Sequence, residues 1–191
     1  WEGKGSIFKA NVNLYYMHFK NELILNGHLG LNGLPGHVNA DNSFRTGAEV
    51  SFDVEPVKGL HIVNATSYAY GKVNKKDVCV NATHIFFPSW TLFQDIHYDA
   101  NVGNIAFTVG ANYDLRSKIY LDLDNQYSLP INMSLNVYGS VTFRDRIELS
   151  LRMNNITNHL NYSYGSVNGD GEIMYVQEAK FNCLGAVKFY F

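Results

Sequence analysis

The feature that most constrains the fold is a strict alternation of apolar and polar residues. Between Asn132 and Phe143, the odd-numbered positions hold apolar residues or glycine, and the even-numbered positions hold mainly Asn, Ser and Thr. Successive side chains of a β-strand point to opposite faces, so this pattern predicts a strand with one apolar face. No stretch competes as an amphipathic helix, and the sequence therefore predicts an all-β fold.

The same alternation recurs along the chain and predicts eight antiparallel strands that form a meander. Most of them reach ten residues or more, whereas strands in soluble sheets have about 5–6 residues and bilayer-spanning strands about 9–11. The predicted strands lie near residues 7–20, 43–55, 59–71, 89–100, 104–121, 131–143, 146–155 and 181–191. Their length favours transmembrane strands.

The connections between these strands alternate in length. Tight turns are predicted at 56–58, 101–103 and 144–145, and long loops at 23–42, 72–88, 122–130 and 156–180. Outer-membrane barrels have short periplasmic turns and longer extracellular loops. We therefore expect the long loops to be extracellular and the chain to end on the periplasmic side.

The apolar face could instead be the core of a soluble sandwich, because both folds produce the same alternation. Three features favour the membrane: the polar face is rich in Asn, Ser, Thr and Gly, aromatic residues gather near the strand ends, and the chain finishes on apolar residues of one face.

In a barrel, the two faces of each strand would meet different surroundings. The residues that would face lipid are Leu135, Val137, Leu149 and Leu151, and those that would face the lumen are Asn136, Ser150 and Arg152.

Composition excludes several other functions. The 191 residues suit one domain, the apolar runs are too short for a membrane helix, and a formal net charge of −2 argues against nucleic-acid binding. The chain lacks an initiator Met and a leader, so we read it as a mature piece of a larger protein. It contains no G-x-S-x-G, H-E-x-x-H or P-loop motif, so we expect neither an enzyme nor a cofactor.

Six short motifs follow one another along nearly the whole chain. They are Asn13–Glu22, Arg45–Glu49, Glu55–Leu60, Tyr120–Asp122 ahead of Pro130, Asn155–Asn158 and Lys188–Phe191. In this order and spacing they resemble the C-terminal third of a TonB-dependent outer-membrane receptor.

The resemblance implies an integral protein of the bacterial outer membrane that imports a scarce nutrient. It implies a 22-stranded barrel with a plug domain, of which residues 1–191 form the C-terminal portion without the plug. The implied partners are outer-membrane lipid, the remainder of the barrel and plug, TonB through the plug, and the barrel-assembly machinery. On family grounds the substrate is an iron–siderophore, haem or cobalamin-like complex. The alternative is a stand-alone eight-stranded barrel with an adhesive or structural role.

Substrate contacts are expected in the long loops. The candidates are His28, His37, Phe86, Phe87, Tyr162, Tyr164 and Tyr175. The aromatic residues could equally serve loop packing or the membrane interface, and the histidines could be ordinary surface residues. Asp122 and Asp124 share a strand parity that would suit a metal, but an exposed acidic loop explains them better, and we expect no metal site.

Two further predictions concern the chain terminus and the cysteines. Phe191, with Phe189 and Val187 on the same face, resembles the terminal signal that the assembly machinery reads on outer-membrane barrels. Cys79 and Cys183 would both lie in an oxidising compartment and could form a disulfide. Against this pairing, Cys183 has the parity of the lipid face, and the question stays open at this point.

Overall fold

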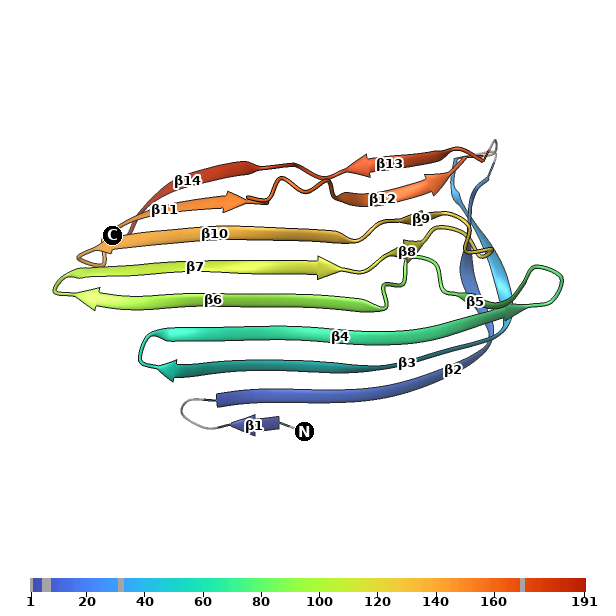
Figure 1. Cartoon of the computed structure of the whole chain (residues 1–191), viewed down its shortest axis with the longest axis horizontal. Coiled ribbons are helices and arrows are strands. Elements are labelled where there is room, and N and C mark those ends of the chain that lie inside the picture. Colours follow the sequence, from blue (N-terminus) through green and yellow to red (C-terminus); the bar gives the residue numbers. More distant parts are fainter. Residues whose placement is uncertain (1, 5–7, 31–32, 169–170) are drawn as a thin grey trace.

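The fold is a sheet of long antiparallel strands, seen in a computed structural model that describes residues 2–4, 8–30, 33–168 and 171–191. Eight long strands lie side by side in chain order (Figure 1). They are β2 (Phe8–Leu29), β3 (Pro35–Val57), β4 (Leu60–Lys75), β6 (Trp90–Val102), β7 (Ile105–Arg116), β10 (Asn132–Phe143), β11 (Ile147–Asn154) and β14 (Asn182–Phe189). The eight predicted strands and their meander are confirmed.

Short strands raise the strand count above eight, which corrects the sequence prediction. They are β1 (Glu2–Lys4), β5 (Cys79–Thr83), β8 (Ile119–Tyr120), β9 (Ser128–Leu129), β12 (Tyr162–Val167) and β13 (Ile173–Gln177). Much of the predicted first loop is also strand, because β2 and β3 stay paired as far as Leu29 and Pro35. Asn21, with a φ of 55°, interrupts the alternation there without ending the pairing.

The sheet is an open arc. Within the described residues, β14 pairs only with β11, at the opposite edge from β2 and β1. The far end of the β2–β3 hairpin curves back and meets β12 through one parallel bridge between His28 and Val167. The meander of long strands is thus present, whereas the described residues do not form a closed ring.

The two ends of the sheet differ (Figure 1). At the turn end, tight turns join β3 to β4, β6 to β7 and β10 to β11, as predicted. Gly59 in the first of these turns has a φ of +85°, and a Cβ there would lie 2.2 Å from the backbone oxygen of Asp99. Glycine is therefore required where this turn packs against β6. The loop end carries the long connections.

The strands have one apolar and one polar face, which we name the outer and the inner face. Leu149 and Leu151 lie opposite Val141 and Gly139 on the outer face, and Leu149 leaves 46% of its surface exposed. On the inner face, Asn136 is buried and donates a 2.7 Å hydrogen bond to Asn112. The predicted alternation is confirmed; contact of the outer face with lipid stays a prediction.

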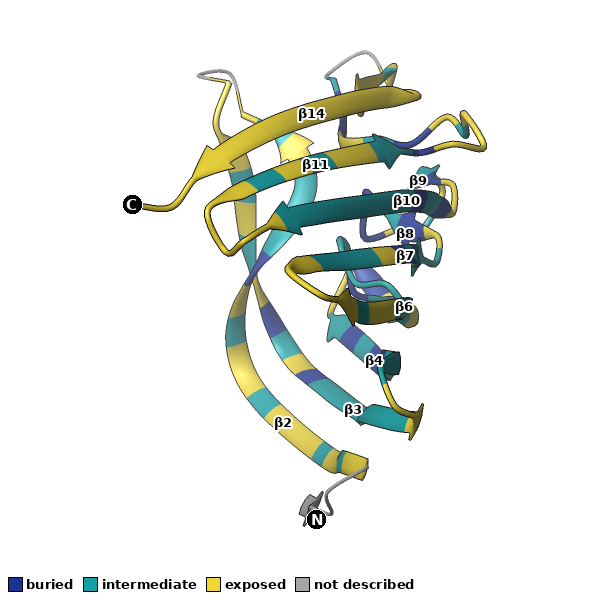
Figure 2. Ribbon diagram, turned by 90° about the vertical axis from the view of Figure 1, so that its left-hand side faces the viewer, coloured by how far each residue is buried: buried dark blue, intermediate teal, exposed yellow. Residues whose placement is uncertain are grey.

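Buried apolar side chains gather at the loop end in two clusters. The first loop core contains Ile24, Ala40, Val73, Cys79, Ala82 and Leu123, and the second contains Ile119, Leu121, Leu129 and Val167. Figure 2 shows that the long strands between the two ends, which we call the strand wall, are mostly exposed or half-buried. No described residue belongs to a helix that is long and apolar enough to cross a membrane.

Candidate functional site

A pocket of about 410 Å³ opens on the inner face near the loop end, and we call it the loop-end pocket. Its floor comes from β4, β6, β7 and β10, and residues 161 and 178 on either side of the β12–β13 pair complete its lining. The polar side chains around it include those of Asp114, Arg116, Asn132, Ser134, Asn161 and Glu178. Side chains from distant parts of the chain therefore converge on one cavity.

Arg116 gives this pocket its positive charge. Its Nη2 donates a 2.8 Å hydrogen bond to the backbone oxygen of Tyr162, while its Nε is buried without a partner among the described residues. An unpaired buried donor is costly, so a ligand acceptor at this position would be favoured. The carboxylates of Asp114 and Glu178 add acceptors, and the pocket can bind polar groups of either charge.

Two asparagines attach the segment before β12 to β10. Asn161 uses both side-chain polar atoms on the backbone of Met133, accepting from its N–H and donating to its oxygen, each at 2.9 Å. Asn132 does the same with the backbone of Tyr162, at 3.1 and 2.8 Å. Each amide thus takes the place of a neighbouring strand, which holds one wall of the loop-end pocket in position.

The predicted loop aromatics come together in pairs. Phe86 and Tyr164 stack with ring centroids 5.4 Å apart, and Tyr162 and Tyr175 lie 4.9 Å apart. One member of each pair, Phe86 or Tyr162, packs against the second loop core, while Tyr164 and Tyr175 leave 41% and 47% of their surfaces exposed. Packing thus accounts for the inner members, and the outer members form a surface on which a flat ligand could stack.

The remaining loop candidates lie elsewhere. Phe87 packs against the ring of His84, with centroids 5.5 Å apart. His28 and His37 are both exposed on the β2–β3 hairpin, where His37 pairs with Leu25. The structure therefore assembles four of the seven predicted ligand contacts into two ring pairs. Of the other three, Phe87 pairs with His84 instead, and His28 lies beside β12 without joining either pair.

A cluster around Arg45 was not predicted as a unit. Arg45 forms a 2.7 Å ion pair with Glu22, which also accepts a hydrogen bond from Ser43, and its Nη2 lies 3.4 Å from Nδ1 of His84. Burial, together with the charge of Arg45, lowers the pKa of His84. Because Glu22 already neutralises Arg45, this cluster attaches the loop with His84 to the wall rather than presenting a free charge.

Both cysteines are free, so the disulfide considered from the sequence is not formed. Cys79 is buried in the first loop core at the loop end, where burial raises the pKa of its thiol. Cys183 is exposed on the outer face of β14, opposite Met153. The alternation of the last strand explains the correction, because it turns Cys183 away from the inner face and the loops.

The terminal residues lie on the open edge of the sheet. Val187 and Phe189 point to the outer face opposite Leu149 and Ile147, and Phe191 follows β14 in full exposure. The position fits a strand edge that another strand can extend. Recognition of Phe191, Phe189 and Val187 by the assembly machinery stays a prediction.

Sequence reasoning also missed three polar residues near the turn end, His61, His97 and Asp99. A signal for two of them was present, because Asp95-Ile96-His97-Tyr98-Asp99 alternates acid, imidazole and acid on one strand face. Which residue lies beside them depends on the register of β4 and β6, and the sequence alone does not give that register.

No protein-family model and no curated protein matches this chain. Solved structures do match its fold. The ferric yersiniabactin uptake receptor FyuA from Yersinia pestis aligns with a TM-score of 0.80 and 15% identity, over 97% of this chain and 28% of that one. The ferric preacinetobactin receptor BauA from Acinetobacter baumannii gives 0.71 and 19% over the same shares.

A third match is the copper transporter OprC, with a TM-score of 0.75 and 13% identity, over 100% of this chain and 30% of that one. The chain thus spans between a quarter and a third of the length of these structures. At these identities the likeness concerns the fold: the chain has the fold of an arc of a TonB-dependent receptor barrel.

Proposed function

We propose that this chain is part of a bacterial outer-membrane receptor that takes up a scarce metal chelate, coupled to TonB. The observation that carries the proposal is the open arc of long strands, with an apolar outer and a polar inner face, that aligns along 97% of its length with one stretch of a siderophore receptor. An open arc needs further strands to close a barrel. The partners are then lipid, the remainder of the barrel, its plug, TonB through that plug, and the barrel-assembly machinery.

The substrate class we favour is a ferric siderophore. The structures that match include receptors for ferric yersiniabactin and ferric preacinetobactin. In this chain, the exposed rings of Tyr164 and Tyr175 offer stacking surfaces, and the unpaired Nε of Arg116 offers a donor to an anionic ligand oxygen. Haem and cobalamin-like complexes are the outcomes that the binding test below separates from a siderophore.

The arrangement of the edges disfavours a stand-alone eight-stranded barrel. Such a barrel needs its last long strand to pair with its first, whereas β14 and β2 lie at opposite ends of the row of eight long strands and do not pair with each other. An adhesive or structural role for this chain alone therefore has no closed ring to support it.

The test uses the full-length protein, purified in detergent, and a panel of ferric siderophores, haem and cobalamin. We expect saturable binding of one ferric siderophore, measured by quenching of intrinsic fluorescence, and a loss of roughly tenfold or more in affinity for Arg116→Gln. Ser150→Ala, on the inner face near the other end of the wall, is the matched control. Binding of none of these compounds, together with normal growth of a deletion strain in iron-limited medium, would refute the proposal.

A further inference from the structure

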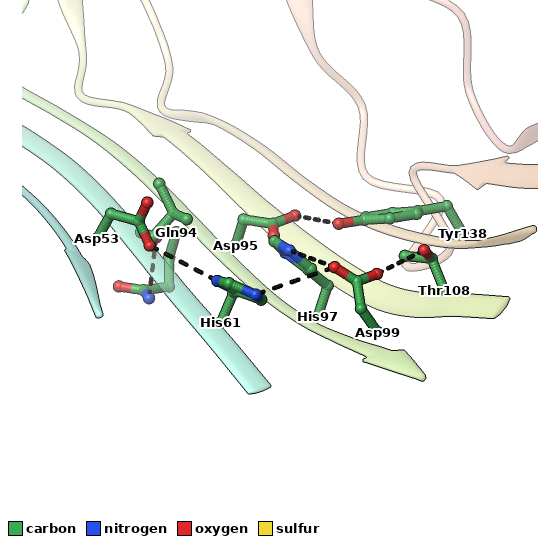
Figure 3. A network of polar contacts seen from close by, with 9 residues as sticks. Asp53, His61, Gln94, Asp95, His97, Asp99, Thr108 and Tyr138 are labelled. Carbon is green, nitrogen blue, oxygen red and sulfur yellow. Dashed lines mark hydrogen bonds and ion pairs between the residues drawn. The ribbon is translucent and has the colours of Figure 1, made fainter. Parts of the chain in front are cut away.

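Two histidines and an aspartate meet on the inner face near the turn end (Figure 3). His97 and Asp99 are two residues apart on β6 and share a face, and His61 lies directly opposite His97 on β4. One nitrogen of each imidazole and one oxygen of Asp99 lie within 4.8 Å of one another. These donor types and this spacing suit a transition-metal ion.

In each imidazole of this cluster, Nε2 faces Asp99 and Nδ1 faces a different aspartate. Nδ1 of His97 contacts a carboxylate oxygen of Asp95 at 2.5 Å, and its Nε2 lies 3.7 Å from Oδ2 of Asp99. For His61, Nδ1 lies 3.9 Å from Asp53, and Nε2 lies 3.9 Å from the same Oδ2. In metal-binding histidines the nitrogen away from the metal is usually held by a carboxylate. Nδ1 of His97 is held in this way by Asp95, whereas the distance from Nδ1 of His61 to Asp53 is too long for a hydrogen bond.

The third ligand is oriented as well. Thr108 donates a 2.5 Å hydrogen bond to Oδ1 of Asp99, which leaves Oδ2 facing the two imidazoles. The backbone N–H of Asp99 donates at 2.8 Å to the oxygen of Gly59, the turn glycine that precedes His61 by two residues. The tight turn therefore sets the distance between the ligands from β4 and β6.

The charges around the cluster favour a cation. Asp53, Asp95 and Asp99 surround the two imidazoles. No ion pair joins these three carboxylates to a described lysine or arginine; the cations nearby are Lys9, which lies opposite Asp53 on β2, and Arg152, which lies over the ring of Tyr138. The rings of His61 and His97 stack with centroids 4.8 Å apart, which places the two imidazoles side by side. Neutral imidazoles beside carboxylates are the form that binds a metal, and a divalent ion would balance the excess negative charge.

We propose that His61, His97 and Asp99 bind a divalent first-row transition-metal ion of the Zn²⁺ type on the inner wall of the barrel. Bonds of about 2.0–2.2 Å in tetrahedral geometry place ligand atoms roughly 3.3–3.6 Å apart. The two imidazole nitrogens lie 3.7 and 3.9 Å from Oδ2 of Asp99, and no two ligand atoms of the set are more than 4.8 Å apart, so metal binding would draw the three side chains closer together. Three protein ligands leave a coordination position open to water or to a group from the rest of the protein, and the ion would join β4 to β6.

The test is metal binding to the full-length protein in detergent micelles after removal of bound metal with EDTA. Co²⁺ is the spectroscopic probe, because imidazole and carboxylate ligands give it visible absorption bands, and Zn²⁺ should displace it. We expect wild-type protein to bind one equivalent of Co²⁺ more than His97→Asn or His61→Asn. Asp95→Asn keeps all three ligands but loses the group that orients His97, and should weaken binding about 10- to 100-fold.

The control is His18→Asn, which removes an exposed histidine from the outer face of β2. It should retain the full stoichiometry, and heat-modifiable gel migration should be unchanged in every variant if the barrel has folded. Equal Co²⁺ stoichiometry and affinity in wild type, His61→Asn and His97→Asn would overturn the proposal. Because no substrate is used, this outcome is independent of whether the chain serves siderophore uptake.

Discussion

Leu121 at the loop end is fully buried, whereas Leu149 in the strand wall leaves 46% of its surface exposed. The first belongs to an apolar cluster formed by the long connections, and the second belongs to the outer face of the sheet, where none of the buried apolar clusters of the described residues lies. The loop end therefore has its own hydrophobic core, while the wall obtains its apolar contacts from whatever surrounds the outer face. The two regions of the chain therefore depend on different surroundings: the loop end on its own buried core, and the wall on the medium that contacts its outer face.

The largest expected effect tests the core of the loop end. Leu121→Ala should cost about 2–5 kcal/mol of local stability, because it removes a fully buried side chain and leaves a cavity. Leu149→Ala should cost about 1 kcal/mol or less. Hydrogen exchange in the full-length protein measures both costs, in the loop segments for Leu121→Ala and in β11 and its neighbours for Leu149→Ala. Equal costs would mean that the two regions do not differ in packing.

The next effect tests the outer face of the wall. Leu149→Arg should cost roughly 2–4 kcal/mol in a bilayer if the residue lies near the midplane, whereas its neighbour Ser150→Arg, which points to the inner face, should be mild. Urea unfolding of the full-length protein in lipid vesicles provides the comparison. Similar costs at the two positions would contradict the assignment of the faces.

A third prediction concerns the inner face of the wall. A Cβ on Gly110 would lie 2.7 Å from Cβ of His97 and from Cζ and the hydroxyl oxygen of Tyr138, whose hydroxyl donates a 2.8 Å hydrogen bond to Asp95. Gly110→Ala should therefore displace Tyr138 and cost roughly 1–3 kcal/mol. Gly139→Ala, on the outer face, meets its nearest atom at 3.3 Å and is the matched control. If the control is as destabilising as Gly110→Ala, the wall does not have a packed inner side.

The strands of the wall could be predicted from local sequence patterns. The polar sites on the wall could not, because they depend on which residues of different strands lie opposite each other. Alternation at residues 132–143 reports only which residues share a face, and this suffices to identify a strand. The short turns between strands add which strands are neighbours. Alternation does not report register, which places His61 opposite His97 and pairs Asn64 with Gln94 on the outer face through a 3.0 Å hydrogen bond.

The loop end was less predictable for a different physical reason. Its strands are short and its cores combine segments that are far apart in the chain, so no local period marks them. The aromatic candidates illustrate this, because a list of loop aromatics includes Phe86, which is packed against the second core, as readily as Tyr164, which is exposed.

The smallest expected effect is a pH dependence of stability that the loop end has and that arises from His84. Burial and the nearby charge of Arg45 lower the pKa of His84 in the folded protein below its ordinary value of about 6.5. As the pH falls below about 6.5, the unfolded chain therefore binds a proton before the folded chain does, and the loop end loses stability until the pH reaches the folded pKa. Above about pH 6.5 the full contribution of neutral His84 is present.

His84→Gln should remove this component of the pH dependence while keeping a side chain that can donate to the backbone oxygen of Phe44, which lies 3.3 Å from Nε2 of His84. The measurement is hydrogen exchange of residues 79–87 in the full-length protein, compared between pH 7.5 and pH 5 after correction for the intrinsic rate. His18→Gln, on the exposed outer face of β2, is the control and should leave the pH response of these residues unchanged. A pH response that survives in His84→Gln would assign the loss of protection to other groups and separate His84 from the stability of the loop end.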